Sequence, residues 1–170
     1  MLYTHLINQS YPTKKDLRNL IYYVLGEHCT TNIYGATGML LSNPETMYQS
    51  MIQVKKQFNK TEGRQALHLI ISFDKDDSEW LTPHLALEIG YQLALTMEGV
   101  QTVFGVHDNT DKLHIHMVLN SVNYITGLKI GISSQKVYCH INNQLNQILN
   151  QYRNTYNPTN VVLSIDDLLT

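Results

Sequence analysis

The stretch HDNTDKLHIHMVLN, residues 107–120, joins two predicted strands and contains three histidines. One apolar run covers residues 101–107 and ends on His107, and a second run, residues 113–122, contains His114 and His116. The polar segment 108–112 separates them. Two such runs joined by a short polar turn are typical of an antiparallel hairpin.

The second run alternates between two kinds of side chain. In a strand, residues i and i+2 point to the same face of the sheet. One face is therefore predicted to be apolar and to pack against helices, while the other carries polar groups. The apolar set is Leu113, Ile115, Met117 and Leu119, and the alternating set is His114, His116, Val118 and Asn120.

The histidines on the polar face have the spacing of metal ligands. His114 and His116 lie roughly 6.5–7 Å apart at Cα, and both imidazoles can converge on one ion. His107 joins them if it stands opposite His114 across the hairpin, or if a bulge restores the phase. Structural zinc sites are closed by four protein ligands and are rich in cysteine. Three histidines with no cysteine or acid at matching spacing favour an open, chemical site.

The rest of the chain predicts an α+β fold, with a central, mostly antiparallel sheet and packed helices. Residues 27–43 are expected to be irregular. We expect one domain over residues 1–156 and a C-terminal tail over 157–170, which would suit the start of a longer protein. Strands are expected near residues 1–7 and 66–73, and helices near 13–26, 43–58, 82–99 and 133–152.

Charge and composition exclude several classes of protein. Twelve Lys and Arg against fourteen Asp and Glu give a net charge of −2, so DNA contacts must be local. No apolar run approaches the roughly 18–20 residues of a membrane span, and the N-terminus does not read as a secretory signal. A cytoplasmic protein without membrane association is expected, with Cys29 and Cys139 as reduced thiols.

Four segments together resemble the relaxases, the mobilisation nucleases of the HUH endonuclease superfamily, and most closely the Mob-P-like group. The third relaxase motif is matched by GVHDNTDKLHIHMVLNSVNYITGLKI, residues 105–130. The other three segments follow in the family order: a helix with tyrosine, LRNLIYYVLGE, residues 17–27; a middle stretch, QVKKQFNKTEGRQALHLIISF, residues 53–73; and a helix, TPHLALEIGYQLA, residues 82–94.

The resemblance implies site- and strand-specific DNA nicking and rejoining at an origin of transfer. In the family, three histidines hold a divalent ion (Mn²⁺, Mg²⁺ or Zn²⁺) that polarises the scissile phosphate. A tyrosine attacks it, leaving a 5′-phosphotyrosine and a free 3′-OH. The implied partners are single-stranded DNA beside a hairpin, accessory relaxosome proteins and a coupling protein, and a monomer is expected. The alternatives are a rolling-circle initiator or single-strand transposase of the HUH type, and a non-catalytic, metal-stabilised DNA-binding module.

Tyr22 and Tyr23 compete for the role of nucleophile. At 100° per residue, Tyr23 borders the apolar stripe of its predicted helix, which faces the sheet, and Tyr22 points farther away. The family pattern, with the tyrosine after a short apolar run and before Ile or Val, also falls on Tyr23. We therefore favour Tyr23 and keep Tyr22 as the alternative.

Further site residues follow from the resemblance and from charge. Many relatives have Asp two residues after the first histidine, where this chain has Asn109. Asp111 is assigned to the catalytic group, and Asp108, His68 and Asn120 to an outer shell around the ligands. Ser72 matches a family position near the DNA backbone. The basic candidates for phosphate contacts are Lys55, Lys56, Lys60, Arg64 and Lys129.

Overall fold

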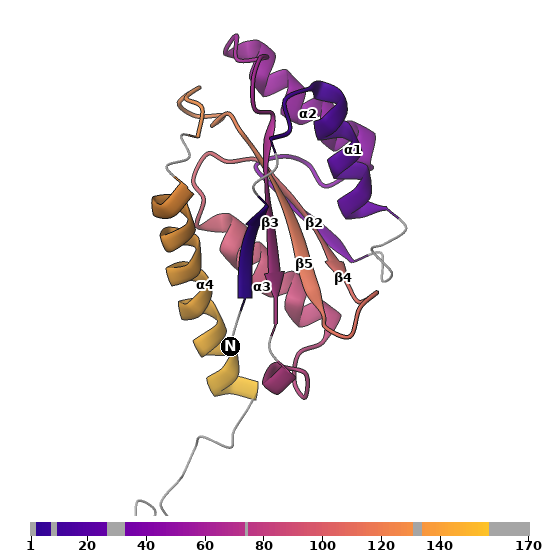
Figure 1. Ribbon diagram of the computed structural model, residues 1–170, viewed down its shortest axis with the longest axis vertical. Helices are drawn as coiled ribbons and strands as arrows, with labels where there is room; N and C mark the ends of the chain where they lie inside the picture. Colours follow the sequence, from indigo (N-terminus) through magenta and orange to yellow (C-terminus); the bar gives the residue numbers. More distant parts are fainter. Residues whose placement is uncertain (1–2, 8–9, 27–32, 74, 131–133, 157–170) are drawn as a thin grey trace, which may run out of the picture.

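A five-stranded sheet forms the centre of the molecule in the computed structural model, which describes residues 3–7, 10–26, 33–73, 75–130 and 134–156 (Figure 1). The strand order is β1-β3-β5-β4-β2, and every pair is antiparallel. The predicted α+β class is confirmed. The strands are β1 (Tyr3–Ile7), β2 (Tyr34–Thr37), β3 (Ala66–Ser72), β4 (Thr102–His107) and β5 (His114–Asn120).

The predicted hairpin is the pair β4 and β5. His107 is paired with His114, and Gly105 is paired with His116. Because directly paired residues of antiparallel strands share a face, His107 lies on the same face as His114 and His116 without a bulge. On the other side of β5, His114 is paired with Ser72 of β3.

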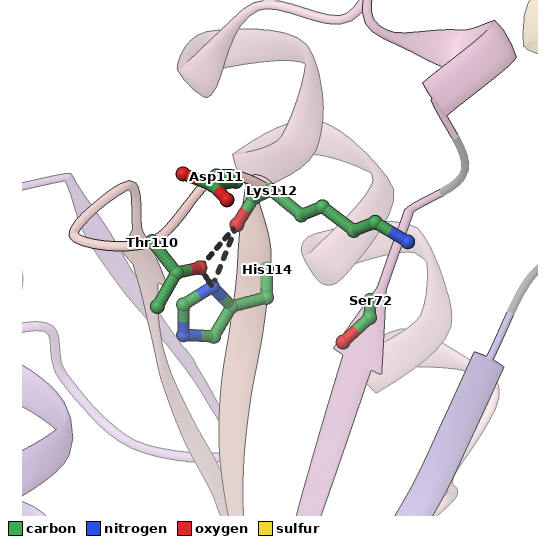
Figure 2. Close-up of a pocket in the computed structure, with 5 residues that line it drawn as sticks. All are labelled: Ser72, Thr110, Asp111, Lys112 and His114. Carbon is green, nitrogen blue, oxygen red and sulfur yellow. Dashed lines mark hydrogen bonds between the residues drawn. The ribbon is translucent and has the colours of Figure 1, made fainter.

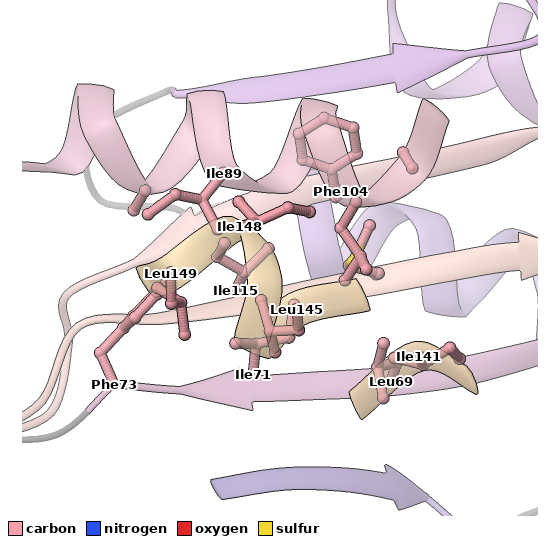
Figure 3. Packing of buried hydrophobic residues seen from close by; sticks show 14 of the residues in the cluster. Leu69, Ile71, Phe73, Ile89, Phe104, Ile115, Ile141, Leu145, Ile148 and Leu149 are labelled. Atoms are coloured by element: carbon pink, nitrogen blue, oxygen red, sulfur yellow. The ribbon is translucent and has the colours of Figure 1, made fainter. Parts of the chain in front are cut away.

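One face of the sheet is covered by α3 (Pro83–Leu95) and α4 (Ser134–Tyr156). Figure 3 shows Ile89 of α3 and Leu145 of α4 packed over Ile115 and Ile71 of the sheet. The predicted apolar set of the hairpin lies here: Ile115, Met117 and Leu119 are core residues, and Leu113 packs against them. This layer is the main hydrophobic core and holds the hairpin flat against the helices.

The opposite face carries the histidines and is covered by α1 (Lys14–Leu25) and α2 (Pro44–Gln57). Thr13 caps α1 in a capping box with Asp16, and the apolar side of α1 buries Leu17 and Ile21. The sheet contributes small or branched residues to this second core, among them Val118. The polar face predicted from the alternation is therefore a core at one end of the sheet and a histidine site at the other.

The expectation that residues 27–43 are irregular is wrong at β2. This edge strand is short and contains Gly35, a residue that is depleted in strands. The glycine is required by close packing, since a Cβ there would lie 2.5 Å from Cζ of Phe104 and 2.7 Å from Cζ of Tyr91. The glycine is explained by this tertiary contact, which cannot be seen in the sequence. For this reason the strand was not predicted.

A short 3₁₀ turn, Lys75–Asp77, links β3 to the segment before α3. Within the described residues, no helix combines the length and apolar character needed to cross a membrane.

Candidate metal and tyrosine site

The three histidines of the hairpin are close enough to hold one metal ion. One ligand nitrogen from each of His107, His114 and His116 lies within 4.8 Å of the others. The pairing of His107 with His114 brings the third ring to the two that share β5. The facial cluster predicted from the sequence is thus present, and its donor set of three imidazoles suits a first-row divalent ion with remaining coordination positions.

Hydrogen bonds to backbone carbonyls fix two of the rings. His107 Nε2 donates to Val24 O at 2.8 Å. His114 Nδ1 donates to Lys112 O at 3.0 Å, as Figure 2 shows. A carbonyl only accepts, so the proton must be on these nitrogens. The lone pairs are then on Nδ1 of His107 and on Nε2 of His114. Partners of this kind orient metal-bound histidines in proteins.

The bond from His107 also positions helix α1. Val24 is in the last turn of α1, where backbone carbonyls have no partner within the helix. His107 satisfies one of these carbonyls, so the same ring that can ligate the ion anchors the helix end that carries Tyr23. The contact depends on residues 83 positions apart, and it could not be predicted from local pattern.

The third ring, His116, is buried against a fourth histidine. Its Nδ1 lies 2.8 Å from Nε2 of His68 on the neighbouring strand β3. Burial, followed by the charges of nearby histidines, lowers the pKa of His116 to about 3. Burial and then the charge of His107 lower the pKa of His68 to about 4. Both rings are therefore neutral at pH 7, and neutral imidazole is the form that binds metals.

Tyr23 and Tyr22 point in different directions. The Tyr23 ring is 5.4 Å from the ring of His116 and 6.1 Å from that of His107, measured between centroids, and 45% of the residue is exposed. Tyr22 faces α2, where its hydroxyl donates to Glu45 at 3.1 Å and its ring lies under Arg18. Tyr23 therefore borders the sheet-facing stripe, as the angular argument predicts.

An open pocket of about 440 Å³ lies beside His114 at the end of the hairpin (Figure 2). Ser72, Asp111 and His114 line it, so the structure brings two of the predicted site residues next to a candidate ligand. Thr110 and Lys112 complete the lining and were not singled out from the sequence. Asp108 is exposed in the same turn.

Lys55 is a correction to the predicted phosphate contacts. It is 0% exposed, and its ammonium donates to Gln65 O, Ser121 Oγ and Asn120 Oδ1. A buried ammonium with three oxygen partners has no donor left for DNA. Its burial, with a smaller contribution from Lys129, lowers the pKa of Lys55 to about 7. Lys55 supports the fold.

Asn120 is a second correction, because it does not belong to the outer shell of the histidines. Its side chain accepts from Lys55 and donates to Met51 O at 3.2 Å and Gln101 Oε1 at 2.9 Å. It stands at the far end of β5 from His114, six residues along a strand, or about 20 Å. The trailing Asn of the histidine motif is a structural residue that ties β5 to α2.

The remaining basic candidates lie near that same far end. Lys56, Lys60 and Arg64 are exposed between the last turn of α2 and the start of β3. Lys129 is exposed and donates to the backbone oxygen of Glu62. The structure thus separates these four predicted phosphate contacts from the histidines instead of gathering them around one site.

This sheet, with three histidines on one face and a helix-borne tyrosine beside them, defines a relaxase-like nuclease domain of the HUH type. The chain belongs to the relaxase family, since the family model for the MobA/VirD2-like relaxase nuclease domain matches residues 23–156. DNA nicking in mobilisation is the activity of this family. The family predicted from the sequence is confirmed.

Two relatives support this assignment. The chain is 28% identical to protein TraI of Escherichia coli over 116 residues, which is 65% of this chain and 15% of that protein. It is 30% identical to the group II intron-interrupted relaxase LtrB of Lactococcus lactis over 148 residues, which is 72% of this chain and 26% of that protein. The chain therefore spans about a seventh of the length of the first relative and about a quarter of the length of the second.

The fold has a solved counterpart as well. A chain from work on the molecular basis of vancomycin resistance transfer in Staphylococcus aureus superposes with a TM-score of 0.61 over 91% of this chain and 93% of that chain. The two sequences are 11% identical, so this likeness concerns the fold alone.

Proposed function

We propose that the protein nicks and rejoins one DNA strand at an origin of transfer through a covalent 5′-phosphotyrosine on Tyr23. The observation that carries this proposal is the position of Tyr23, partly exposed and with its ring 5.4 Å from that of His116. Family membership indicates DNA nicking, and the short distance between the Tyr23 ring and a candidate metal site supports Tyr23 as the nucleophile.

His107, His114 and His116 would hold one divalent ion. Imidazole ligands suit Mn²⁺ and Zn²⁺ better than Mg²⁺, which prefers oxygen. The ion, when bound, acts as a Lewis acid on the scissile phosphate. The protein's own contribution is to keep His116 neutral by burial and to orient the three rings through Val24 O, Lys112 O and His68.

The chemical step exchanges one phosphate ester for another. The Tyr23 oxygen forms a bond to phosphorus, and the bond from phosphorus to the 3′-oxygen breaks. The strand on the 5′-phosphate side stays on Tyr23, the phenolic proton leaves and the 3′-oxygen gains a proton. We assign this proton exchange to Asp111, at the pocket beside His114, with Asp108 exposed in the same turn. Reversal of the step rejoins the strand.

Single-stranded DNA beside a hairpin is the proposed substrate, since the attacked phosphate must be free of a duplex. Ser72 lines the pocket next to His114 and is proposed to contact the DNA backbone. Lys56, Lys60, Arg64 and Lys129 are proposed to contact the strand about 20 Å farther along β5. Accessory relaxosome proteins and a coupling protein complete the proposed assembly, in the cytoplasm where the DNA is handled.

The experiment compares two neighbouring tyrosines of one helix. Wild type, Tyr23→Phe and Tyr22→Phe are incubated with Mn²⁺ and an oligonucleotide made of a hairpin and a single-stranded tail, and covalent adducts are separated by denaturing electrophoresis. Wild type and Tyr22→Phe should form the adduct, and Tyr23→Phe should form none while still binding DNA. Loss of adduct in Tyr22→Phe instead would overturn the assignment. DNA binding without any adduct in wild type would favour the non-catalytic DNA-binding module.

A further inference from the structure

Three buried side chains form a hydrogen-bonded row that ends on the candidate metal site. The Tyr11 hydroxyl lies 2.9 Å from Nδ1 of His68, and Nε2 of His68 lies 2.8 Å from Nδ1 of His116. Tyr11, His68 and His116 are 7%, 5% and 4% exposed. Polar groups this deep are retained in proteins when each has a partner, and both nitrogens of His68 have one here.

The row can be protonated in two opposite directions. In the first, His116 Nδ1–H donates to His68 Nε2, and His68 Nδ1–H donates to the Tyr11 oxygen. In the second, Tyr11 O–H donates to His68 Nδ1, and His68 Nε2–H donates to His116 Nδ1. A neutral imidazole carries one proton, so only the first direction leaves a lone pair on Nε2 of His116.

We propose that Tyr11 and His68 are positioning residues that set the tautomer of His116, so that its Nε2 faces the ion with His107 and His114. The inference rests on the metal site of the proposed function and adds two residues that do not touch the ion. The Tyr11 oxygen accepts the proton of His68 Nδ1, which turns the His68 Nε2 lone pair towards His116. Outer partners of this type normally change metal affinity 10–100-fold.

The residues around His68 indicate that it is present for its hydrogen bonds and not only to fill the core. Ala66, two residues before His68 on the same face of β3, and Val118, paired with His68, are apolar members of the second core. An apolar side chain would fill the position of His68 without any hydrogen bond. Instead, the rings of His68 and His116 lie 5.1 Å apart between centroids, and the Tyr11 ring stands edge-on to His68 at 6.1 Å.

The test removes one oxygen atom and has a matched control. Tyr11→Phe deletes the acceptor. The control, Tyr152→Phe, deletes the hydroxyl of a tyrosine on the other face of the sheet that is also 7% exposed and accepts a hydrogen bond from Gln92 at 2.8 Å. Mn²⁺ affinity is measured by calorimetry on the full chain. Tyr11→Phe should weaken it about 2- to 10-fold, the value of one net hydrogen bond, and Tyr152→Phe should not change it.

Two variants of His68 distinguish its role in orienting the His116 ring from its role in packing. His68→Leu fills space but offers no acceptor, and it should weaken Mn²⁺ binding about 10- to 100-fold. His68→Gln keeps an acceptor oxygen and should restore part of the affinity. Equal losses in both variants, or equal losses in Tyr11→Phe and Tyr152→Phe, would overturn the inference.

Nitrogen NMR of the metal-free protein reads the tautomers directly. With histidines labelled with ¹⁵N, His68 and His116 should both carry the proton on Nδ1, and Tyr11→Phe should shift His68 towards the Nε2–H form. A proton on Nε2 of His68 in wild type would refute the proposed direction. If wild type binds no Mn²⁺, the metal part of the proposed function fails, while this measurement still decides whether Tyr11 controls His68.

Discussion

Replacing Lys55 by Met removes a buried ammonium and keeps most of the volume of the side chain. In the wild type, this ammonium donates hydrogen bonds to oxygens of Gln65, Asn120 and Ser121. These bonds join α2 to the ends of β3 and β5. We expect the variant to unfold more easily and to bind DNA with unchanged affinity. This expectation reverses the prediction made from the basic sequence alone.

The structure sets the size of the effect. A buried acceptor that loses its partner costs about 1–3 kcal/mol. Each of the three residues keeps another bond at this point, since Gln65 O accepts from Ser121 N, Asn120 Oδ1 accepts from Val122 N, and Ser121 Oγ donates to Arg64 O. The cost per acceptor therefore falls at the lower end of this range, about 1 kcal/mol each. Release from the burial penalty of the ammonium offsets part of this sum, leaving about 2 kcal/mol.

The assay is thermal unfolding of Lys55→Met beside Lys56→Met, its exposed neighbour. For a chain of this size, 2 kcal/mol lowers the melting temperature by about 4–8 °C, and Lys56→Met should stay within about 0.5 kcal/mol of wild type. In a salt titration of single-stranded DNA binding, only Lys56→Met should change the affinity. Unchanged stability in Lys55→Met, or a loss of DNA affinity matching that of Lys56→Met, would contradict a structural role for Lys55.

The same variant has a pH signature. The pKa of Lys55 is lowered from 10.5 to about 7, first by burial and then by Lys129. Between pH 7 and 10.5 the unfolded chain holds this proton and the folded chain does not, so the free energy of unfolding rises with pH by up to about 1.4 kcal/mol per unit. Lys55→Met should lack this rise. A wild-type stability that falls steadily over the same range would contradict the lowered pKa.

Two further predictions concern the histidine row and the edge strand. The pKa values of His68 and His116 are lowered to about 4 and 3, so below pH 6.5 the unfolded chain binds protons that the folded chain does not. In metal-free buffer, the free energy of unfolding should therefore fall between pH 6.5 and pH 4, by about 1.4 kcal/mol per pH unit for each histidine. His68→Leu should halve this slope, and an unaltered slope would contradict the lowered pKa of His68. Gly35→Ala should destabilise the protein by about 1–3 kcal/mol, because the new Cβ would lie 2.5 Å from Phe104, and a melting curve like that of wild type would show that β2 can shift.

Local pattern was sufficient for the hairpin and its histidines. The two-residue period of a strand puts His114 and His116 on one face, and the polar turn of residues 108–112 is short enough to bring His107 opposite His114. The side of α1 that carries Tyr23 followed from the 100° step of a helix. These features depend on residues close in sequence, so the sequence alone predicts them.

The burial of Lys55 and the contact of Tyr11 with His68 could not be predicted, because both depend on residues far apart in the sequence. Lys55 reads as part of a basic run, and it is buried because Asn120, 65 positions later, lies against it. Tyr11 has no motif around it, and its role depends on His68, 57 positions away. Such pairs of polar residues leave no periodic signal in a single sequence.

Mapping the site of the covalent adduct shows which residue attacks the DNA. Wild-type protein is incubated with Mn²⁺ and the hairpin-plus-tail oligonucleotide, digested with nuclease and protease, and the peptide that carries the residual nucleotide is sequenced by mass spectrometry. We expect a 5′-linked nucleotide on Tyr23, and we expect His114→Ala to form no adduct. A nucleotide on Tyr22, on a histidine or on any other residue would contradict this expectation.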